Sequence, residues 1–356
     1  MPKISVIAPF YGVEQYIHQF MESVLNQTFD DFELIAVDDG SPDKCPEILD
    51  EYAKKDGRIR VIHQKNAGVS AARNTGIDAS NGEYAYIVDS DDWLEPNTLE
   101  VLYRDAQKTG ADVVMGDCTV QTPEGQYRLY QFTDKFYTED PKILAGIQQY
   151  VLCQKFNPYY SRKSTSGYAA PWGKLIRMSL IKDNNIRFDP YVKGLFDDGL
   201  FTLEVYDRMK SFYYGKEYIY NYRINENSIT QRFKKNEIDI LRLGFERVED
   251  FIKKYHREER LQLPYYCHVV RFLIYRLTSY FFNDKNGKTY REIRKELLDT
   301  INSEPFKTAI KKCKYKYFVK NHQKVLLCMR IHSVFGMKLY TDIKKKRISR
   351  RNRNNK

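Results

Sequence analysis

Short apolar runs rich in β-branched residues alternate with helix-like stretches over the first third of the chain. The runs predict strands over 4–10, 32–39, 58–63, 83–89 and 111–117. Between the first two runs, apolar residues recur with helical spacing at Tyr16, Ile17, Phe20, Val24 and Leu25, and further helices are predicted over 43–55 and 68–80. This alternation predicts an α/β domain with a mostly parallel central sheet and helices on both faces.

The alternation stops near residue 225. Long helical patterns follow, with apolar and charged residues mixed over 236–256 and 265–283. The sequence therefore predicts an α/β domain over 1–230, a helical extension over 231–310 and a tail over 311–356.

Residues suited to bind a ligand gather where three predicted strands end. They are Pro9, Phe10 and Tyr11 after the first strand, Asp38, Asp39, Gly40 and Ser41 after the second, and Asp89, Ser90, Asp91 and Asp92 after the fourth. In open parallel sheets, ligands bind beyond the carboxyl ends of the strands. Three polar clusters at one edge are hard to ascribe to turn formation, so the pattern indicates a ligand site there.

The fourth strand runs into three aspartates within four positions, Asp89, Asp91 and Asp92. Carboxylates this close repel one another, so a cation or a ring of donors must compensate. Mg²⁺ and Mn²⁺ prefer such oxygen ligands. The alternative is an acidic turn in which Asp92 or Asn97 caps a helix over 97–108.

Charge is divided unevenly along the chain. The net charge is +11, but residues 311–356 hold 16 Lys or Arg and one acid, Asp342, which leaves −4 on the first 310 residues. Apolar residues recur near helical spacing in this basic segment at Leu326, Leu327, Ile331, Val334, Phe335, Leu339 and Ile343. The pattern is typical of a helix in a membrane interface, held by acidic headgroups. The alternative is a helix packed on the protein's own core.

Composition narrows the class of protein. An apolar content of 42% suffices for a real core. Six cysteines show neither a CxxC pair nor metal-ligand spacing, and "MPKISVIAPF" is no secretory leader, so we expect reduced thiols and a cytoplasmic protein. Because no apolar run approaches the roughly 18–20 residues of a spanning helix, any membrane contact should be peripheral.

Four motifs, in order, resemble those of family 2 glycosyltransferases with the GT-A fold. They are "ISVIAPFYGVEQYI", "SVLNQTFDDFELIAVDDGSPD", "NAGVSAARNTGI" and "GEYAYIVDSDDW". Shorter matches follow at "AAPWGKLIRMSLI", "LFDDGLF" and "YRINENSIT". The resemblance implies a Rossmann-like nucleotide-sugar-binding domain, with a donor half over about 1–117 and an acceptor half over 118–230.

The resemblance also implies a UDP-sugar donor. The residues that would bind it are Pro9, Tyr11, Glu14, Asp38, Asp39, Gly68, Arg73, Asp89, Ser90, Arg223 and Ser228. Asp38 would accept the uracil N3 proton, and Pro9 and Tyr11 would flank the base. Gly12 stands where the family usually has Asn. Alternatives remain. Tyr11 could be a core aromatic, Arg73 could form a structural salt bridge, and Arg223 and Ser228 of "YRINENSIT" could serve loop packing.

A divalent cation would accompany this donor, because the diphosphate gains charge as the sugar departs. By resemblance, the Asp89-Ser90-Asp91 segment is a DXD motif. The metal site, for Mn²⁺ or Mg²⁺, would lie at Asp91 and Asp92, with Asp91 as the ligand and Asp92 supporting the turn or the acceptor side.

Catalysis of an inverting transfer needs one carboxylate to take the proton of the attacking hydroxyl. In "FDDGLF" the second acid, Asp198, resembles the family's base, and Asp197 stands where Glu is commoner. The alternative for Asp198 is a helix cap. Trp172 and Lys174 resemble residues that flank the acceptor pocket. We assign Asp197 to the same acceptor pocket.

The favoured function is an inverting, metal-dependent transfer of a hexose or N-acetylhexosamine to a lipid-linked surface glycan, such as a capsule or teichoic-type polymer. The protein would then be cytoplasmic and peripheral on the anionic inner face of the membrane. One alternative is a sugar nucleotidyltransferase, although "APFYGVEQ" lacks the expected Gly-rich basic signature. Another is a non-catalytic nucleic-acid-binding or scaffold protein; nucleic acid is disfavoured because it leaves the acidic clusters unexplained.

Overall fold

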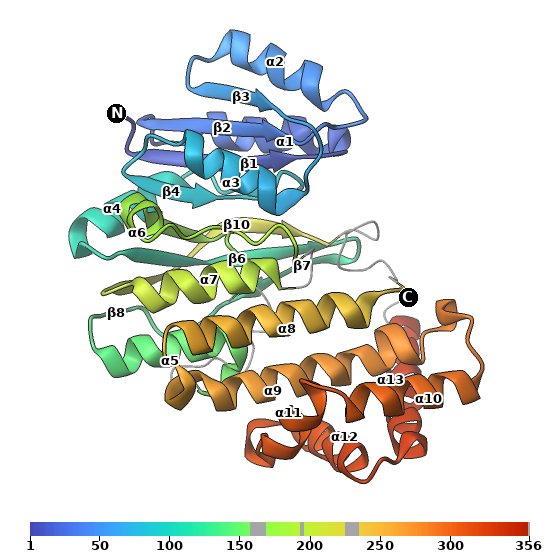
Figure 1. Cartoon of the computed structure of the whole chain (residues 1–356). Helices are drawn as coiled ribbons and strands as arrows, with labels where there is room; N and C mark the ends of the chain where they lie inside the picture. Colours follow the sequence, from blue (N-terminus) through green and yellow to red (C-terminus); the bar gives the residue numbers. More distant parts are fainter. Residues whose placement is uncertain (157–168, 193–195, 225–234, 355–356) are drawn as a thin grey trace. The chain divides into compact units, whose positions relative to one another are not determined.

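The structure is a computed structural model that describes residues 1–156, 169–192, 196–224 and 235–354. The chain divides into two compact units, shown in Figure 1. Unit 1 combines Met1–Val151 with Asn157–Ser228, and unit 2 combines Leu152–Phe156 with Ile229–Lys356. Unit 2 therefore takes in both the predicted helical extension and the predicted tail.

A ten-stranded sheet forms the centre of unit 1 in the described part of the chain. Its strands are β1 (Ile4–Phe10), β2 (Phe32–Asp38), β3 (Ile59–His63), β4 (Tyr84–Ile87), β5 (Trp93–Leu94), β6 (Val113–Thr122), β7 (Gly125–Leu129), β8 (Phe136–Thr138), β9 (Lys174–Arg177) and β10 (Phe212–Arg223). The main order is β3-β2-β1-β4-β9-β6-β10-β5, with β7 beside β6 and β8 beside β10. The predicted α/β class is confirmed.

Strand directions divide this sheet into two parts. The strands β3, β2, β1 and β4 are parallel to one another, as are β6 and β10. Strand β9 runs antiparallel between β4 and β6 and so joins the two parallel groups. The short strands β5, β7 and β8 are antiparallel additions.

Helices cover both faces of the sheet. The helices are α1 (Glu14–Leu25), α2 (Cys45–Lys55), α3 (Val69–Ala79), α4 (Thr98–Thr109), α5 (Pro141–Leu152), α6 (Met178–Asp183) and α7 (Asp197–Arg208). All lie in unit 1 except the last residue of α5, Leu152, which belongs to unit 2. The predicted helices over 43–55, 68–80 and 97–108 are confirmed as α2, α3 and α4 within a residue or two at each end. Figure 1 shows α1 and α3 on opposite faces of the parallel strands.

The alternation of side chains along β1 explains this arrangement. Val6 and Phe10 point into the core shared with α1, where the rings of Phe10 and Phe20 meet edge to face at 5.4 Å. Ile7 points the other way, to α3, where a Cβ on Gly76 would stand 2.4 Å from its Cγ2 atom. Because only glycine permits this approach, Gly76 seats α3 directly on the sheet.

Unit 2 is helical. Its helices are α8 (Glu237–Lys254), α9 (Glu258–Arg276), α10 (Tyr290–Asn302), α11 (Phe306–Lys312), α12 (Lys320–Arg330) and α13 (Val334–Asn354), with short 3₁₀ turns η1 (Gln154–Phe156), η3 (Asp284–Asn286) and η4 (Tyr315–Tyr317) and a π turn η2 (Leu277–Phe281). Within the described residues, none of the helices has the length and apolar character needed to cross a bilayer.

The segment Leu152–Phe156 belongs to unit 2 through specific contacts. The carbonyl oxygen of Leu152 lies 3.0 Å from Nδ1 of His268 in α9. Burial lowers the pKa of His268 to about 3, so the ring is neutral and can donate from this nitrogen. The ring of Phe156 stacks on Tyr317 at 4.0 Å.

Candidate active site

The carboxyl ends of β1, β2 and β4 lie side by side at one edge of the sheet. Phe10 pairs with Asp38 across β1 and β2, and Ile7 pairs with Ile87 across β1 and β4. The acidic residues that follow β2 and β4 are therefore brought to the same edge, as the sequence predicts. The remaining question is what each side chain contacts there.

Asp39 holds the loop that leads into α3. Its carboxylate accepts the N–H groups of Ala67 at 2.9 Å and Gly68 at 2.8 Å, and Nε2 of Gln64 at 2.7 Å. The backbone of Gly68 has a φ of +94°, which favours glycine. Asp39 is 2% exposed, so its side chain positions the loop from beneath.

Asp38 is fixed by two partners. Its Oδ1 atom accepts the N–H of Ser41 at 2.9 Å, and its Oδ2 atom lies 2.9 Å from Nδ1 of His63. The other ring nitrogen of His63 lies 3.2 Å from Asp50. The hydrogen bond to Asp38 raises the pKa of His63, with a further contribution from Asp50 and against the effect of burial. His63 is a positioning residue that the sequence analysis missed, because a lone histidine at a strand end carries no motif.

Arg73 of α3 joins the turn after β4 to the first turn of α7. Its Nη2 atom donates to Asp89 at 2.7 Å and its Nη1 atom donates to Asp198 at 2.5 Å. The guanidinium lies 5.0 Å from the ring centroid of Phe188. Arg73 is 3% exposed, so this fork is buried and holds the two carboxylates at a fixed spacing. The salt bridge considered for Arg73 is therefore present in the structure.

The two acids of "FDDGLF" differ in surroundings. Asp197 is 4% exposed and accepts the hydroxyl of Ser70 at 3.0 Å, whereas 36% of the Asp198 side chain is exposed. The N-cap of α7 is Phe196, so Asp198 lies in the first turn and does not cap the helix. Burial raises the pKa of Asp198 to about 7; the Arg73 guanidinium opposes this rise and neighbouring carboxylates add to it.

Asp92 supports the turn after β4. It is 2% exposed; its Oδ2 atom accepts the hydroxyl of Tyr220 at 2.7 Å and its Oδ1 atom accepts the N–H of Arg223 at 2.7 Å. The Tyr220 oxygen also accepts the N–H of Asp89 at 3.2 Å. Burial, with neighbouring carboxylates, raises the pKa of Asp92. Neither Asp92 nor Asn97 caps α4 through its side chain, so the capping alternative is not seen.

Arg223 binds the same turn from β10. Its Nε atom donates to the carbonyl of Asp91 at 2.8 Å, and its Nη2 atom donates to Gln19 at 2.6 Å. The guanidinium lies over the rings of Tyr16 and Trp93, 4.6 and 4.7 Å from their centroids. These contacts match the packing alternative considered for Arg223.

The predicted metal site has few protein ligands. Asp89 and Asp91 are half-buried at the strand tip, and no group of three or more His, Cys, Asp or Glu in the described parts of the chain is arranged to hold a metal ion. Two carboxylates with the oxygens of a bound diphosphate would still form the oxygen-rich set that Mg²⁺ or Mn²⁺ takes. The residues would therefore fit a metal only together with the oxygens of such a diphosphate.

The predicted residues near β1 divide between structural and exposed positions. Ser90 is 5% exposed and donates to the carbonyl of Pro9 at 2.6 Å, which ties β4 to β1. Tyr11 is 53% exposed, so it is no core aromatic and its ring is accessible to a ligand.

Glu14 links the starts of two helices. Its own N–H donates to Asp43 at 3.0 Å, and its carboxylate accepts the N–H of Lys44 at 3.2 Å. Ser228, the last of the predicted donor residues, lies outside the described part of the chain.

Trp172 and Lys174 lie beneath the site. Trp172 is 6% exposed and stacks on Tyr220 with ring centroids 4.6 Å apart and nearly parallel planes. Lys174 is 1% exposed and donates from Nζ to the carbonyl of Ala170. Burial lowers the pKa of Lys174 to about 7, opposed by the charge of Asp198. In this structure Trp172 packs on β10, whereas the Lys174 ammonium binds the segment that precedes β9.

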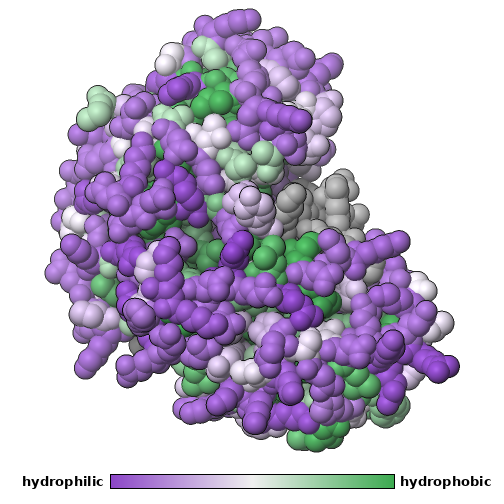
Figure 2. Space-filling view, viewed as in Figure 1, coloured by the Kyte–Doolittle hydropathy of each residue, from purple (hydrophilic) through white to green (hydrophobic). Residues whose placement is uncertain are grey.

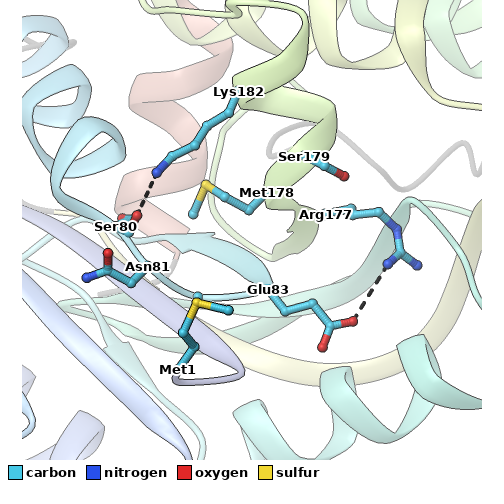
Figure 3. Close-up of a pocket in the computed structure, with 9 residues that line it drawn as sticks. Met1, Ser80, Asn81, Glu83, Arg177, Met178, Ser179 and Lys182 are labelled. Atoms are coloured by element: carbon cyan, nitrogen blue, oxygen red, sulfur yellow. Dashed lines mark hydrogen bonds and ion pairs between the residues drawn. The ribbon is translucent and has the colours of Figure 1, made fainter.

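A separate pocket lies near the start of β4, away from these carboxylates. Figure 3 shows Glu83, Arg177, Lys182 and Ser80 among its lining residues. Both basic side chains already have partners within the protein. Arg177 pairs with Glu83 at 3.7 Å, and Lys182 donates to the carbonyl of Ser80 at 2.6 Å. The pocket contains none of the predicted site residues.

Sequence comparisons agree with the motifs. Residues 5–183 match the family model described as glycosyl transferase family 2. The putative glycosyltransferase EpsH of Bacillus subtilis is 35% identical over 66% of this chain and 64% of its own length. Glycosyltransferase GlyA of Streptococcus pneumoniae is 34% identical over 64% of this chain, but the match spans only 32% of GlyA. The chain thus spans less than two thirds of these relatives.

Solved structures share the fold. Residues 1–349 of Staphylococcus aureus TarS superpose with a TM-score of 0.66 at 19% identity, covering 97% of this chain and 91% of that one. A complex of the same protein with UDP-GlcNAc gives a TM-score of 0.65, with 97% and 92% covered. Likeness at this identity establishes the fold.

Proposed function

This chain belongs to glycosyltransferase family 2, and from that premise we propose that it is an inverting, metal-dependent transferase. It would move a hexose or N-acetylhexosamine from a UDP-sugar to a hydroxyl of a cell-surface glycan. The observation that carries the proposal is the Arg73 fork, which joins Asp89 in the turn after β4 to Asp198 of α7. That a protein of this fold has been crystallised with UDP-GlcNAc supports the donor class.

Asp198 is the proposed general base. It would accept the acceptor's hydroxyl proton while the hydroxyl oxygen attacks the anomeric carbon and the bond to the UDP oxygen breaks. A carboxyl with a pKa of about 7 is well matched to this exchange near neutral pH. Arg73 would hold the base in place, since its second nitrogen is fixed by Asp89.

Asp91, with Asp89 beside it, would hold Mn²⁺ or Mg²⁺ together with the diphosphate. The metal would supply positive charge for the departing UDP. Asp92 and Arg223 would keep the turn in shape, as their contacts with each other and with the Asp91 carbonyl indicate.

We further propose that the acceptor is lipid-linked. The basic segment 311–356, with 16 Lys or Arg against one acid, would hold the protein on the inner, anionic face of the cell membrane.

The experiment is a panel of nucleotide sugars with purified full-length protein, Mn²⁺ and a glycan acceptor, in which UDP release is measured. Asp198→Asn should lower turnover about 100-fold or more, in the range typical of general-base removal, while donor binding by calorimetry persists. Asp134→Asn is the matched control, because that side chain is 87% exposed. Unchanged turnover in Asp198→Asn would refute the role, and release of pyrophosphate in place of UDP would favour a nucleotidyltransferase.

A further inference from the structure

Helix α12 presents one face to the interior of unit 2 and another to solvent. Its buried side chains are Val325, Leu326 and Met329. Lys320, Lys324, Leu327 and Ile331 are exposed and follow one another at four, three and four residues, which places them on one face of the helix and its end. Along this face, two cations precede two apolar residues.

Helix α13 repeats the pattern in the opposite order. Val334, Met337 and Thr341 are buried, whereas Phe335, Leu339 and Ile343 are 72%, 49% and 44% exposed. The exposed three are spaced by four residues and share a face. Lys346, one turn beyond Ile343, and Arg347 are also exposed.

The two apolar stretches meet at the turn between the helices. A Cβ on Gly336 would stand 2.6 Å from Sγ of Cys328, so the start of α13 packs directly on α12. The exposed residues Leu327, Ile331, Phe335, Leu339 and Ile343, here called the apolar apex, therefore follow each other every four residues through the turn. Figure 2 shows hydrophobic atoms exposed at the lower end of unit 2, over the region of α12.

The flanks of the apex are basic. Lys320 and Lys324 lie on one side of it along the chain, and Lys346 and Arg347 on the other. Residues 344–356 contain eight Lys or Arg and no acid. The nearest acid in the sequence, Asp342, is paired with Lys338 at 2.7 Å. An apolar centre with cationic flanks matches a surface whose interior is apolar and whose headgroups are anionic.

We propose that the apolar apex and its basic flanks form a docking surface for an anionic lipid bilayer, with Phe335 and its neighbours entering the headgroup region. This inference deepens the membrane part of the proposed function and rests on it. It also refines the sequence prediction, because Leu326 and Val334 of the predicted apolar set are buried and only the opposite face is available.

The test uses full-length protein and sedimentation with vesicles of phosphatidylcholine alone or mixed with phosphatidylglycerol. We expect binding to the mixed vesicles that weakens with salt. The triple variant Phe335→Ser, Leu339→Ser, Ile343→Ser should bind at least about tenfold more weakly, because each apolar side chain contributes several CH₂ groups. Lys346→Gln with Arg347→Gln should lose about tenfold or more, at roughly fivefold per cation.

Tyr290→Ser is the matched control, since Tyr290 is 45% exposed in α10 of the same unit. It should leave vesicle binding unchanged. Because the substituted side chains are exposed, the triple variant should keep its thermal unfolding midpoint and its UDP-sugar binding. A wild-type protein that binds UDP-sugar but not anionic vesicles would overturn the docking surface and leave the enzymatic proposal intact. A protein that binds anionic vesicles but no nucleotide sugar would overturn the enzymatic proposal and leave the docking surface intact.

Two other results would also overturn the inference. One is vesicle binding that survives the triple variant. The other is self-association or polynucleotide binding that the triple variant abolishes while vesicle binding is absent, which would assign the face to a second copy or to nucleic acid.

Discussion

At the scale of single residues, the site is a set of acids whose surroundings separate their roles. Asp39 and Asp92 are buried and hold backbone N–H groups. Part of the Asp198 side chain is exposed, but loss of hydration at its carboxyl group, with the charges of Asp197 and Asp89, raises its pKa to about 7. Residue type could not distinguish these roles from sequence, because all three are aspartates near a strand or helix end and only their hydrogen-bond partners differ.

The raised pKa of Asp198 predicts a pH dependence. A general base acts in its ionised form, so kcat/KM should increase as the pH rises through about 7. Below this pH, kcat/KM should decrease because Asp198 becomes protonated. Arg73 opposes the rise in the pKa, so Arg73→Gln should move this limb to higher pH. UDP release measured across pH for both proteins would check this, and a wild-type profile without a limb near neutrality would contradict it.

Tyr220 is a positioning residue that the sequence analysis did not identify. Its hydroxyl donates to Asp92 and accepts from the N–H of Asp89, while its ring stacks on Trp172. Tyr220→Phe keeps the stack and removes the hydrogen bonds, so we expect a loss of about 1–3 kcal/mol in unfolding free energy. Metal-dependent donor affinity measured by calorimetry should also fall several-fold.

Tyr220→Leu is the companion variant, since it removes ring and hydroxyl together and should be less stable than Tyr220→Phe. If Tyr220→Phe lowered stability without changing the affinity for donor and Mn²⁺, the positioning role would be wrong and a purely structural one would remain.

At the scale of elements, the alternation of strands and helices was readable from the sequence because side-chain periodicity reports burial locally. Strands β9 and β10 were not predicted. Their pairing depends on β4 and β6, which are distant in sequence, and no local pattern shows that β9 will run antiparallel between them. These two strands carry Lys174, Tyr220 and Arg223. The contacts that these side chains make at the site could therefore not be predicted from the sequence.

The seating of α3 on the sheet gives a prediction for an element. Gly76→Ala would place a Cβ 2.4 Å from Ile7, so α3 must shift and take Arg73 with it. Overpacking of this kind costs about 1–3 kcal/mol. Thermal or denaturant unfolding checks the stability, and UDP release should fall as well.

Gly57→Ala is the control for the Gly76→Ala substitution, because nothing lies within 4 Å of a Cβ at Gly57. It should leave stability within about 0.5 kcal/mol of wild type. Equal effects at the two glycines would refute close packing of α3 as the cause.

At the scale of the whole molecule, the two units interleave along the chain. Unit 2 begins at residue 229 but also holds Leu152–Phe156. A chain ending at 228 should fold and bind UDP-sugar, because all the described residues that we propose to bind the donor lie in unit 1. It should nonetheless aggregate more readily, since Leu152 loses the partners that bury it.

Calorimetry with UDP-sugar and light scattering on the shortened chain would check this. Adding Leu152→Ser to the shortened chain should reduce aggregation without changing donor binding. A soluble, folded shortened chain that fails to bind any UDP-sugar would contradict the assignment of the donor site to unit 1 alone.

The sequence by itself determined the α/β class, the strand-end acidic clusters, the family resemblance and the basic C-terminal charge, because each follows from local periodicity or from residues adjacent in the chain. Only the tertiary structure decided that Arg73 bridges Asp89 and Asp198, that Tyr220 and Arg223 hold the β4 turn, and that one face of α12 and α13 is covered while the other is exposed. These features depend on which distant segments meet, and burial and hydrogen bonding between distant segments are set by packing rather than by neighbours in sequence.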